Sequence, residues 1–100
     1  MKLNFGQLAQ ENPVQLNDNV TVSEADLNGT KVSLVSTTMN ASVTFKNSGI
    51  VFPFQAMGTL TTEGGSMQVA PGEIVYVQSG DVFTPQLGFA TLVMLNNGVD

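Results

Sequence analysis

The stretch MGTLTTEGGSMQVAPGEIVYVQSGDVF, from Met57 to Phe83, decides the fold. Three short apolar runs lie in it, and turns made largely of Gly, Pro, Ser and Asp separate them. The runs end at Leu60, Val69 and Val77. Runs of this length with β-branched and aromatic residues, bounded by such turns, are typical of antiparallel strands. The stretch therefore predicts an all-β protein.

The rest of the chain continues this pattern on both sides of the stretch. Apolar and polar residues alternate around Val20, Val32 and Val43, and Asn28-Gly29 is a strong hairpin signal. Val14 to Leu16 is a short extended piece, and 88–95 is expected to be a strand buried on both faces or against a partner. The pattern predicts a small antiparallel β-sandwich, a jelly roll or a barrel of roughly seven to nine short strands.

Three local features refine this prediction. We expect residues 1–100 to form a single β domain, in which 1–12 are an N-terminal arm that could hold one helical turn. Val35 follows Leu34 out of phase, which predicts a bulge in that strand. Pro53 suits a strand edge or a bulge better than a central position, because proline has no N–H to donate.

The composition limits the classes of partner. Charged residues make up 11% of the chain, the net charge is −5, and Arg is missing. This balance disfavours nucleic acid and anionic membranes, because both require several basic contacts. About a third of the residues are Thr, Ser, Asn or Gln. Uncharged polar groups can be buried at lower cost than charges, so we expect the protein to contact another surface, most plausibly a second copy of itself.

The chain contains neither His nor Cys, which removes the usual nucleophile–base pairs and imidazole metal sites. Carboxylates at Asp18, Glu24 and Asp26 lack the spacing of a recognised calcium loop. Glu63 and Glu73 flank the central strands, but no Trp and a single Tyr are present to stack on sugars. We therefore expect a protein that is not an enzyme and has no cofactor or metal.

Around the central stretch the chain resembles the cupins, a family of small double-sheet barrels. The second cupin motif reads Gly, five residues, Pro, one residue, Gly, two residues, His, three residues, Asn. Gly72 and Gly80 keep this spacing, whereas Gln78, Phe83 and Leu87 stand at its Pro, His and Asn. The metal ligands of the first motif would fall at Thr44, Lys46 and Val51. The resemblance implies a cupin-like barrel without the catalytic metal.

The main functional hypothesis is a non-enzymatic structural protein that acts by self-association. Small, charge-poor all-β chains of this composition resemble the decoration proteins that stabilise tailed-phage capsids. The partners would be other copies and a capsid or other virion protein, and the location would be the virion after synthesis in the host cytoplasm. The interface candidates are the apolar residues of the arm and of the 50–54 strand: Leu3, Phe5, Leu8, Ile50, Phe52 and Phe54.

The alternative hypothesis is a metal-free cupin-like module, located in the cytoplasm, that binds a small ligand. Its ligand would lie at the barrel mouth near Gln55, Tyr76, Gln78 and Phe83. Nothing at the N-terminus resembles a signal peptide, and no apolar run is long enough to cross a membrane.

Overall fold

The computed structural model describes residues 2–100. Within this range the chain forms one short helix and ten strands. In chain order these are α1 (Phe5–Leu8), β1 (Val14–Asn17), β2 (Val20–Leu27), β3 (Thr30–Thr37), β4 (Val43–Thr44), β5 (Gly49–Gln55), β6 (Gly58–Thr62), β7 (Gly65–Val69), β8 (Val75–Val77), β9 (Val82–Pro85) and β10 (Ala90–Leu95). The predicted all-β class is confirmed.

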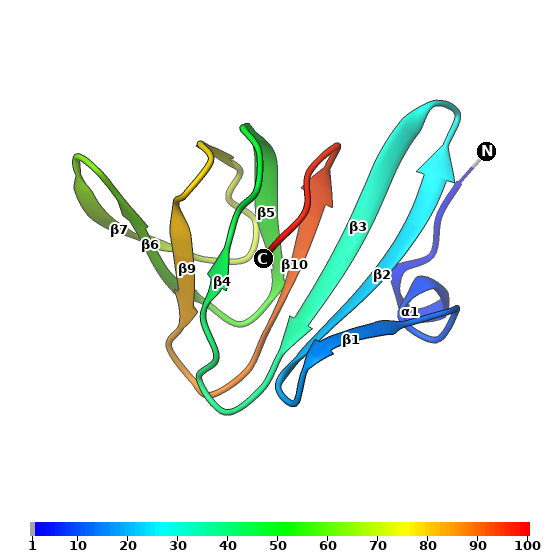
Figure 1. Ribbon diagram of the computed structural model, residues 1–100, viewed down its shortest axis with the longest axis horizontal. Coiled ribbons are helices and arrows are strands. Elements are labelled where there is room, and N and C mark those ends of the chain that lie inside the picture. Colours follow the sequence, from blue (N-terminus) through cyan, green and yellow to red (C-terminus); the bar gives the residue numbers. More distant parts are fainter. Residues whose placement is uncertain (1) are drawn as a thin grey trace.

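The strands form two antiparallel sheets that face each other. The large sheet has the order β1-β2-β3-β10-β5-β8, and the small sheet has the order β4-β9-β6-β7. Figure 1 shows the two sheets inclined as a V, with the C-terminus between them. The strand count exceeds the predicted seven to nine because no strand was predicted at Val82–Pro85. Its four residues end at Pro85, yet β9 lies inside the small sheet, between β4 and β6.

The main core fills the space between the sheets. Its side chains come from the inner faces of both, and alternate residues of a strand point to the same face. Phe45, Leu60, Leu92 and Met94 are the largest side chains that are fully buried there. Burial of apolar surface on this scale supplies most of the free energy that stabilises a small domain.

A second cluster covers the outer face of the large sheet. Leu8 of α1 packs with Val32, Leu34 and Val93, and Leu3, Phe5 and Phe52 border them. Leu34 and Val35 are therefore both buried, one in each cluster, without any irregularity in the strand. The register from Val20↔Thr37 to Leu27↔Thr30 is unbroken. The predicted bulge at Val35 is wrong, because two covered faces explain two successive apolar residues.

The predictions for Pro53 and for the strand at 88–95 are confirmed. Pro53 of β5 lies beyond the three residues, Gly49 to Val51, that pair with β8. The pairing of β5 with β10 also shifts register beside it, so no neighbour requires a proline N–H. β10 lies between β3 and β5 with Leu92 in the inner cluster and Val93 in the outer one.

The N-terminal arm contains the predicted helical turn. Asn4 caps α1, since its side chain accepts a hydrogen bond from the Gln7 N–H at 3.0 Å. The further backbone hydrogen bonds recorded for residues 8–11 run to carbonyls between Asn4 and Leu8, inside the arm itself. The arm thus holds to the sheet through apolar side chains. In the described part of the chain, no helix has the length and apolar character needed to cross a bilayer.

Candidate functional site: a cavity between the two sheets

A cavity of about 320 Å³ lies where the V between the sheets is open. One wall is the β1–β2–β3 part of the large sheet, and the other is formed by the turn after β4 and by the C-terminal segment. This volume is at the lower end of the range for small-molecule sites, roughly 300–1,000 Å³. The lining residues are Asn12, Val14, Leu16, Val22, Glu24, Lys31, Lys46, Asn47, Gly98 and Val99.

The second wall is fixed by a buried asparagine. Asn97 is fully buried, and its side-chain amide exchanges two hydrogen bonds with the backbone of Asn47, at 2.9 and 2.7 Å. Its Oδ1 also accepts from the N–H of Gly98 at 2.7 Å. These bonds tie the C-terminal segment to the turn after β4, so Asn97 positions two of the residues that line the cavity.

Backbone contacts continue this connection along β4. The N–H of Lys46 donates to the carbonyl of Gly98 at 2.9 Å, and the N–H of Asp100 donates to that of Thr44 at 2.9 Å. Phe45 and Val99 form an antiparallel bridge between these contacts. The C-terminal segment therefore extends the small sheet at its β4 edge, which brings Val99 and Gly98 into the cavity wall.

The lining combines an apolar surface with a few charges. Val22 and Val99 are almost completely buried at 8% and 4% exposure, while Leu16 is 43% and Val14 is 61% exposed. Glu24, Lys31 and Lys46 are exposed and bring both signs of charge to the same cavity. Apolar surface with a few polar groups is the usual composition of a ligand site.

The positions that would hold a metal in a cupin do not fit one here. Val51 and Phe83 belong to the apolar core and are 2% exposed each. Lys46 is a cation, and Thr44 offers one hydroxyl. Among residues 2–100, no group of three or more His, Cys, Asp or Glu side chains is placed to bind a metal ion. The core of Phe45, Leu60 and Phe83 occupies the space between the sheets instead.

The four residues predicted at the barrel mouth do not line this cavity. Phe83 is buried in the core, Tyr76 is 66% exposed on β8, and Gln55 is exposed at the end of β5. Gln78 lines a separate hollow of about 350 Å³ with residues of the 61–63 and 79–82 segments. The structure thus does not bring these four side chains to one place.

The structure brings the two predicted sets of interface residues together within one molecule. The ring of Phe5 meets that of Phe54 edge-on, with centroids 5.1 Å apart. Leu8 is buried, and Leu3, Phe5 and Phe52 are half-buried in the outer cluster. Ile50 and Phe54 keep 42% and 44% exposure. The arm therefore covers part of the 50–54 strand.

Three carboxylates, among them Asp26 and Glu73 from the candidates named in the sequence, accept hydrogen bonds in turns. Asp26 accepts a hydrogen bond from the Gly29 N–H at 2.7 Å in the β2–β3 hairpin. Glu73 accepts from the Ala70 N–H at 2.7 Å, and Asp81 accepts from the Gln78 N–H at 2.8 Å. Such local bonds stabilise turns, and they account for these side chains without a ligand.

Sequence reasoning missed Lys31, Lys46 and Asn97. A signal for the lysines was available, since Lys31 and Lys46 are two of the three basic residues and both adjoin predicted strands. Residues 31, 33 and 35 of a strand lie on the same face, because side chains alternate. Val35 is an apolar residue of that face, so Lys31 is expected on the inward face as well. No comparable signal exists for Asn97, because Asn96-Asn97-Gly98 has the composition of an ordinary turn.

The fold is that of the cupins. No family model matches the chain, and no curated protein matches it in sequence. Solved structures are similar to it. One is a cupin superfamily protein from Desulfitobacterium hafniense (TM-score 0.65, 14% identity, covering 82% of this chain and 80% of that one). Another is a sugar phosphate isomerase from a cupin superfamily, from Silicibacter pomeroyi (TM-score 0.69, 17% identity, 95% and 74%).

A third similar structure is AerE from Microcystis aeruginosa, with a TM-score of 0.69 and 15% identity over 83% of this chain. This chain spans only 44% of AerE. At identities of 14–17%, these similarities establish the fold and do not establish a function. It confirms the cupin-like fold that the spacing of Gly72 and Gly80 indicated.

Proposed function

We propose that the protein is a metal-free, cupin-like module that binds a small ligand in the cavity between β1–β2 and the C-terminal segment. The observation that supports this function is the lining itself, in which solvent-reachable apolar side chains adjoin charged ones. Without His, Cys or Arg, the chain has few groups for acid–base or nucleophilic chemistry. The proposed activity is therefore binding.

A ligand panel with a cavity-filling variant tests this function. Molecules of about ten non-hydrogen atoms fill 320 Å³ at roughly 30 Å³ per group. A binder at a hundred times its Kd raises the free energy of unfolding by about 2.7 kcal/mol. We expect at least one panel molecule to raise the melting temperature, and Leu16→Trp to abolish the increase by filling the cavity.

The matched control is Met67→Trp, which adds the same ring on β7, where Met67 is 51% exposed and outside the cavity. This variant should respond to the ligand as the parent does. A panel that leaves the melting temperature unchanged, or a response that survives Leu16→Trp, would count against the proposed site.

The second candidate is the self-associating structural protein, for which a virion component remains the hypothesis. The observation that favours it is an uncharged apolar surface on the outer face of β5 and β8. Ile50 pairs across the strands with Tyr76, and the two are 42% and 66% exposed. Phe54 extends this surface along β5. Exposed apolar surface that adjoins a sheet face often marks an interface between proteins.

Light scattering tests the second candidate. If Ile50, Phe54 and Tyr76 form a contact between copies, the parent has a mass above that of the monomer, and Ile50→Lys returns it to monomer because the contact would bury an unpaired charge. Leu87→Lys is the control, since Leu87 is 66% exposed and lies outside that surface. A parent that stays monomeric at high concentration would argue against self-association. Leu3 and Phe52 are unsuitable test positions, because both pack inside the monomer.

A further inference from the structure

The distribution of basic residues in this acidic chain is uneven. Only three lysines stand against eight carboxylates. Lys31 and Lys46 both line the cavity between the sheets, whereas Lys2 lies with residues of the N-terminal arm. Two of the three cations thus reach one cavity of about 320 Å³. A chain with net charge −5 repels anions in general, so this local concentration of positive charge needs a role.

The two lysines come from opposite walls, and the backbone fixes each of them. The N–H of Lys31 donates to Asn96 Oδ1 at 2.9 Å, and the Lys31 carbonyl accepts from the Asn96 N–H at 2.8 Å. Lys46 is fixed by its 2.9 Å bond to Gly98. The backbone positions of both lysines are therefore fixed, and their flexible side chains can bring an ammonium group to an anion from either wall.

The apolar part of the lining lies beside these cations. Val22 and Val99 form the buried part of the surface, and Leu16 and Val14 project from β1 with part of their area exposed. A ligand that covered Leu16 and Val14 would remove apolar surface from water. The lining is complementary to a molecule with a charged head and a short apolar tail.

Glu24 sets the charge of that head. It lines the same cavity, so the ionised lining side chains are two lysines and one glutamate, with a net charge of about +1. A monoanion balances this charge, whereas a dianion leaves an excess of negative charge next to Glu24. We propose that the cavity binds a small organic monoanion, a carboxylate with a short apolar tail, whose head lies between Lys31 and Lys46. This inference rests on the proposed binding function and specifies its ligand class.

The experiment uses four probes with chains of six carbons: hexanoate, hexanol, hexylammonium and the dianion adipate. Titrations followed by NMR chemical shifts measure each Kd on the whole chain. Hexanoate should bind about threefold more tightly than hexanol, since an exposed charge contact changes an affinity by at most a few-fold. Hexylammonium and adipate should bind more weakly than hexanoate.

Variants assign the effect to named side chains. Lys31→Met and Lys46→Met should each weaken hexanoate binding by about threefold. Glu24→Gln should tighten it, because it removes a negative charge and keeps the shape of the side chain. Lys2→Met is the matched control: it changes the net charge by the same amount but lies in another hollow, so the Kd should stay that of the parent. All four side chains are exposed, and each variant should keep the parent melting temperature.

The outcomes separate this inference from the proposed function. If hexanoate, hexanol and hexylammonium bind equally and the lysine variants change nothing, the anion inference is overturned while the cavity remains a binding site. The same holds if a panel molecule binds but hexanoate does not. If no probe and no panel molecule binds, both proposals fail. If Lys2→Met weakens hexanoate binding as much as Lys31→Met does, the effect comes from the net charge of the protein and not from the cavity. That result would also overturn the inference.

Discussion

Replacing Asn97 with alanine should lower the free energy of unfolding by about 3 kcal/mol. The side chain is fully buried and makes three hydrogen bonds with the backbone of Asn47 and Gly98. Alanine removes all three bonds, and each intramolecular hydrogen bond contributes about 0.5–1.5 kcal/mol to stability. For a domain of this size, the melting temperature should fall by roughly 15 °C.

Guanidinium denaturation followed by far-UV circular dichroism measures the loss. The control is Gln68→Ala, which also removes an amide, one whose single recorded hydrogen bond joins the exposed side chains of Gln68 and Gln86 at 2.8 Å. This control should change the free energy by about 0.5 kcal/mol or less. If Asn97→Ala stays within about 1 kcal/mol of the parent, the amide network is not what holds the C-terminal segment.

Gly58→Ala should destabilise the fold by a similar amount, about 3 kcal/mol. A Cβ at Gly58 would overlap Cζ of Phe83 and lie 2.5 Å from the carbonyl oxygen of Thr84. Phe83 is 2% exposed in the core, and the oxygen belongs to the backbone of β9. Neither can move away without shifting β9 against β6, since Gly58 pairs with Pro85 in that ladder.

Gly64→Ala is the matched control for this glycine. The nearest atom to a Cβ at Gly64 is Oγ1 of Thr62 at 3.9 Å, an ordinary contact. The free energy of unfolding of this variant should stay within about 0.5 kcal/mol of the parent. Equal stabilities for Gly58→Ala and Gly64→Ala would mean that β6 and β9 can separate enough to admit a methyl group.

The sequence allowed the architecture to be predicted because its signals are local. Asn28-Gly29 marked the β2–β3 hairpin, and the spacing of Gly72 and Gly80 indicated the cupin-like fold. β9 was missed because it has only four residues and ends in proline, although Val82, Phe83 and Thr84 are residue types that favour strands. The register of β3 was misjudged because a run such as Leu34-Val35 does not reveal that both faces of its sheet are covered.

The candidate cavity could be predicted only in part. Alternation places Glu24 and Lys31 on inward faces of their strands, but their meeting with Lys46 depends on the way the C-terminal segment returns beside β4. That return is long-range and depends on Asn97, a single residue in a stretch that resembles any polar turn. Contacts between distant segments of one chain leave little trace in a single sequence.

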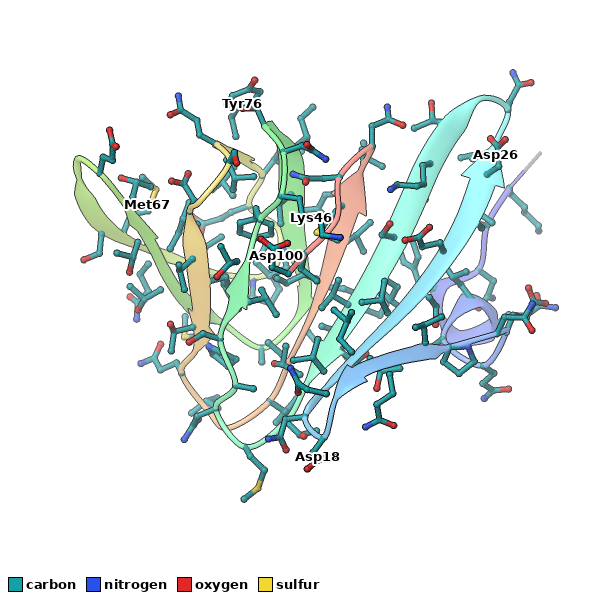
Figure 2. The ribbon with its side chains drawn as sticks, viewed as in Figure 1. Asp18, Asp26, Lys46, Met67, Tyr76 and Asp100 are labelled. Carbon is teal, nitrogen blue, oxygen red and sulfur yellow. The ribbon has the colours of Figure 1, made fainter. Side chains whose placement is uncertain are left out.

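In Figure 2 the labelled charged side chains Asp18, Asp26, Lys46 and Asp100 all lie away from α1. Within the part of the chain that the structure describes, the helix and its flanking residues are not hydrogen-bonded to the large sheet in the way that its strands are hydrogen-bonded to one another. Their recorded hydrogen bonds close within 4–11, and apolar contacts alone join them to the large sheet. Detachment of residues 4–11 would therefore leave every ladder of both sheets intact, and its cost would be the exposure of the outer cluster to water. Apart from Asn12, the residues that line the cavity belong to other segments and would keep their places in such a partly open molecule.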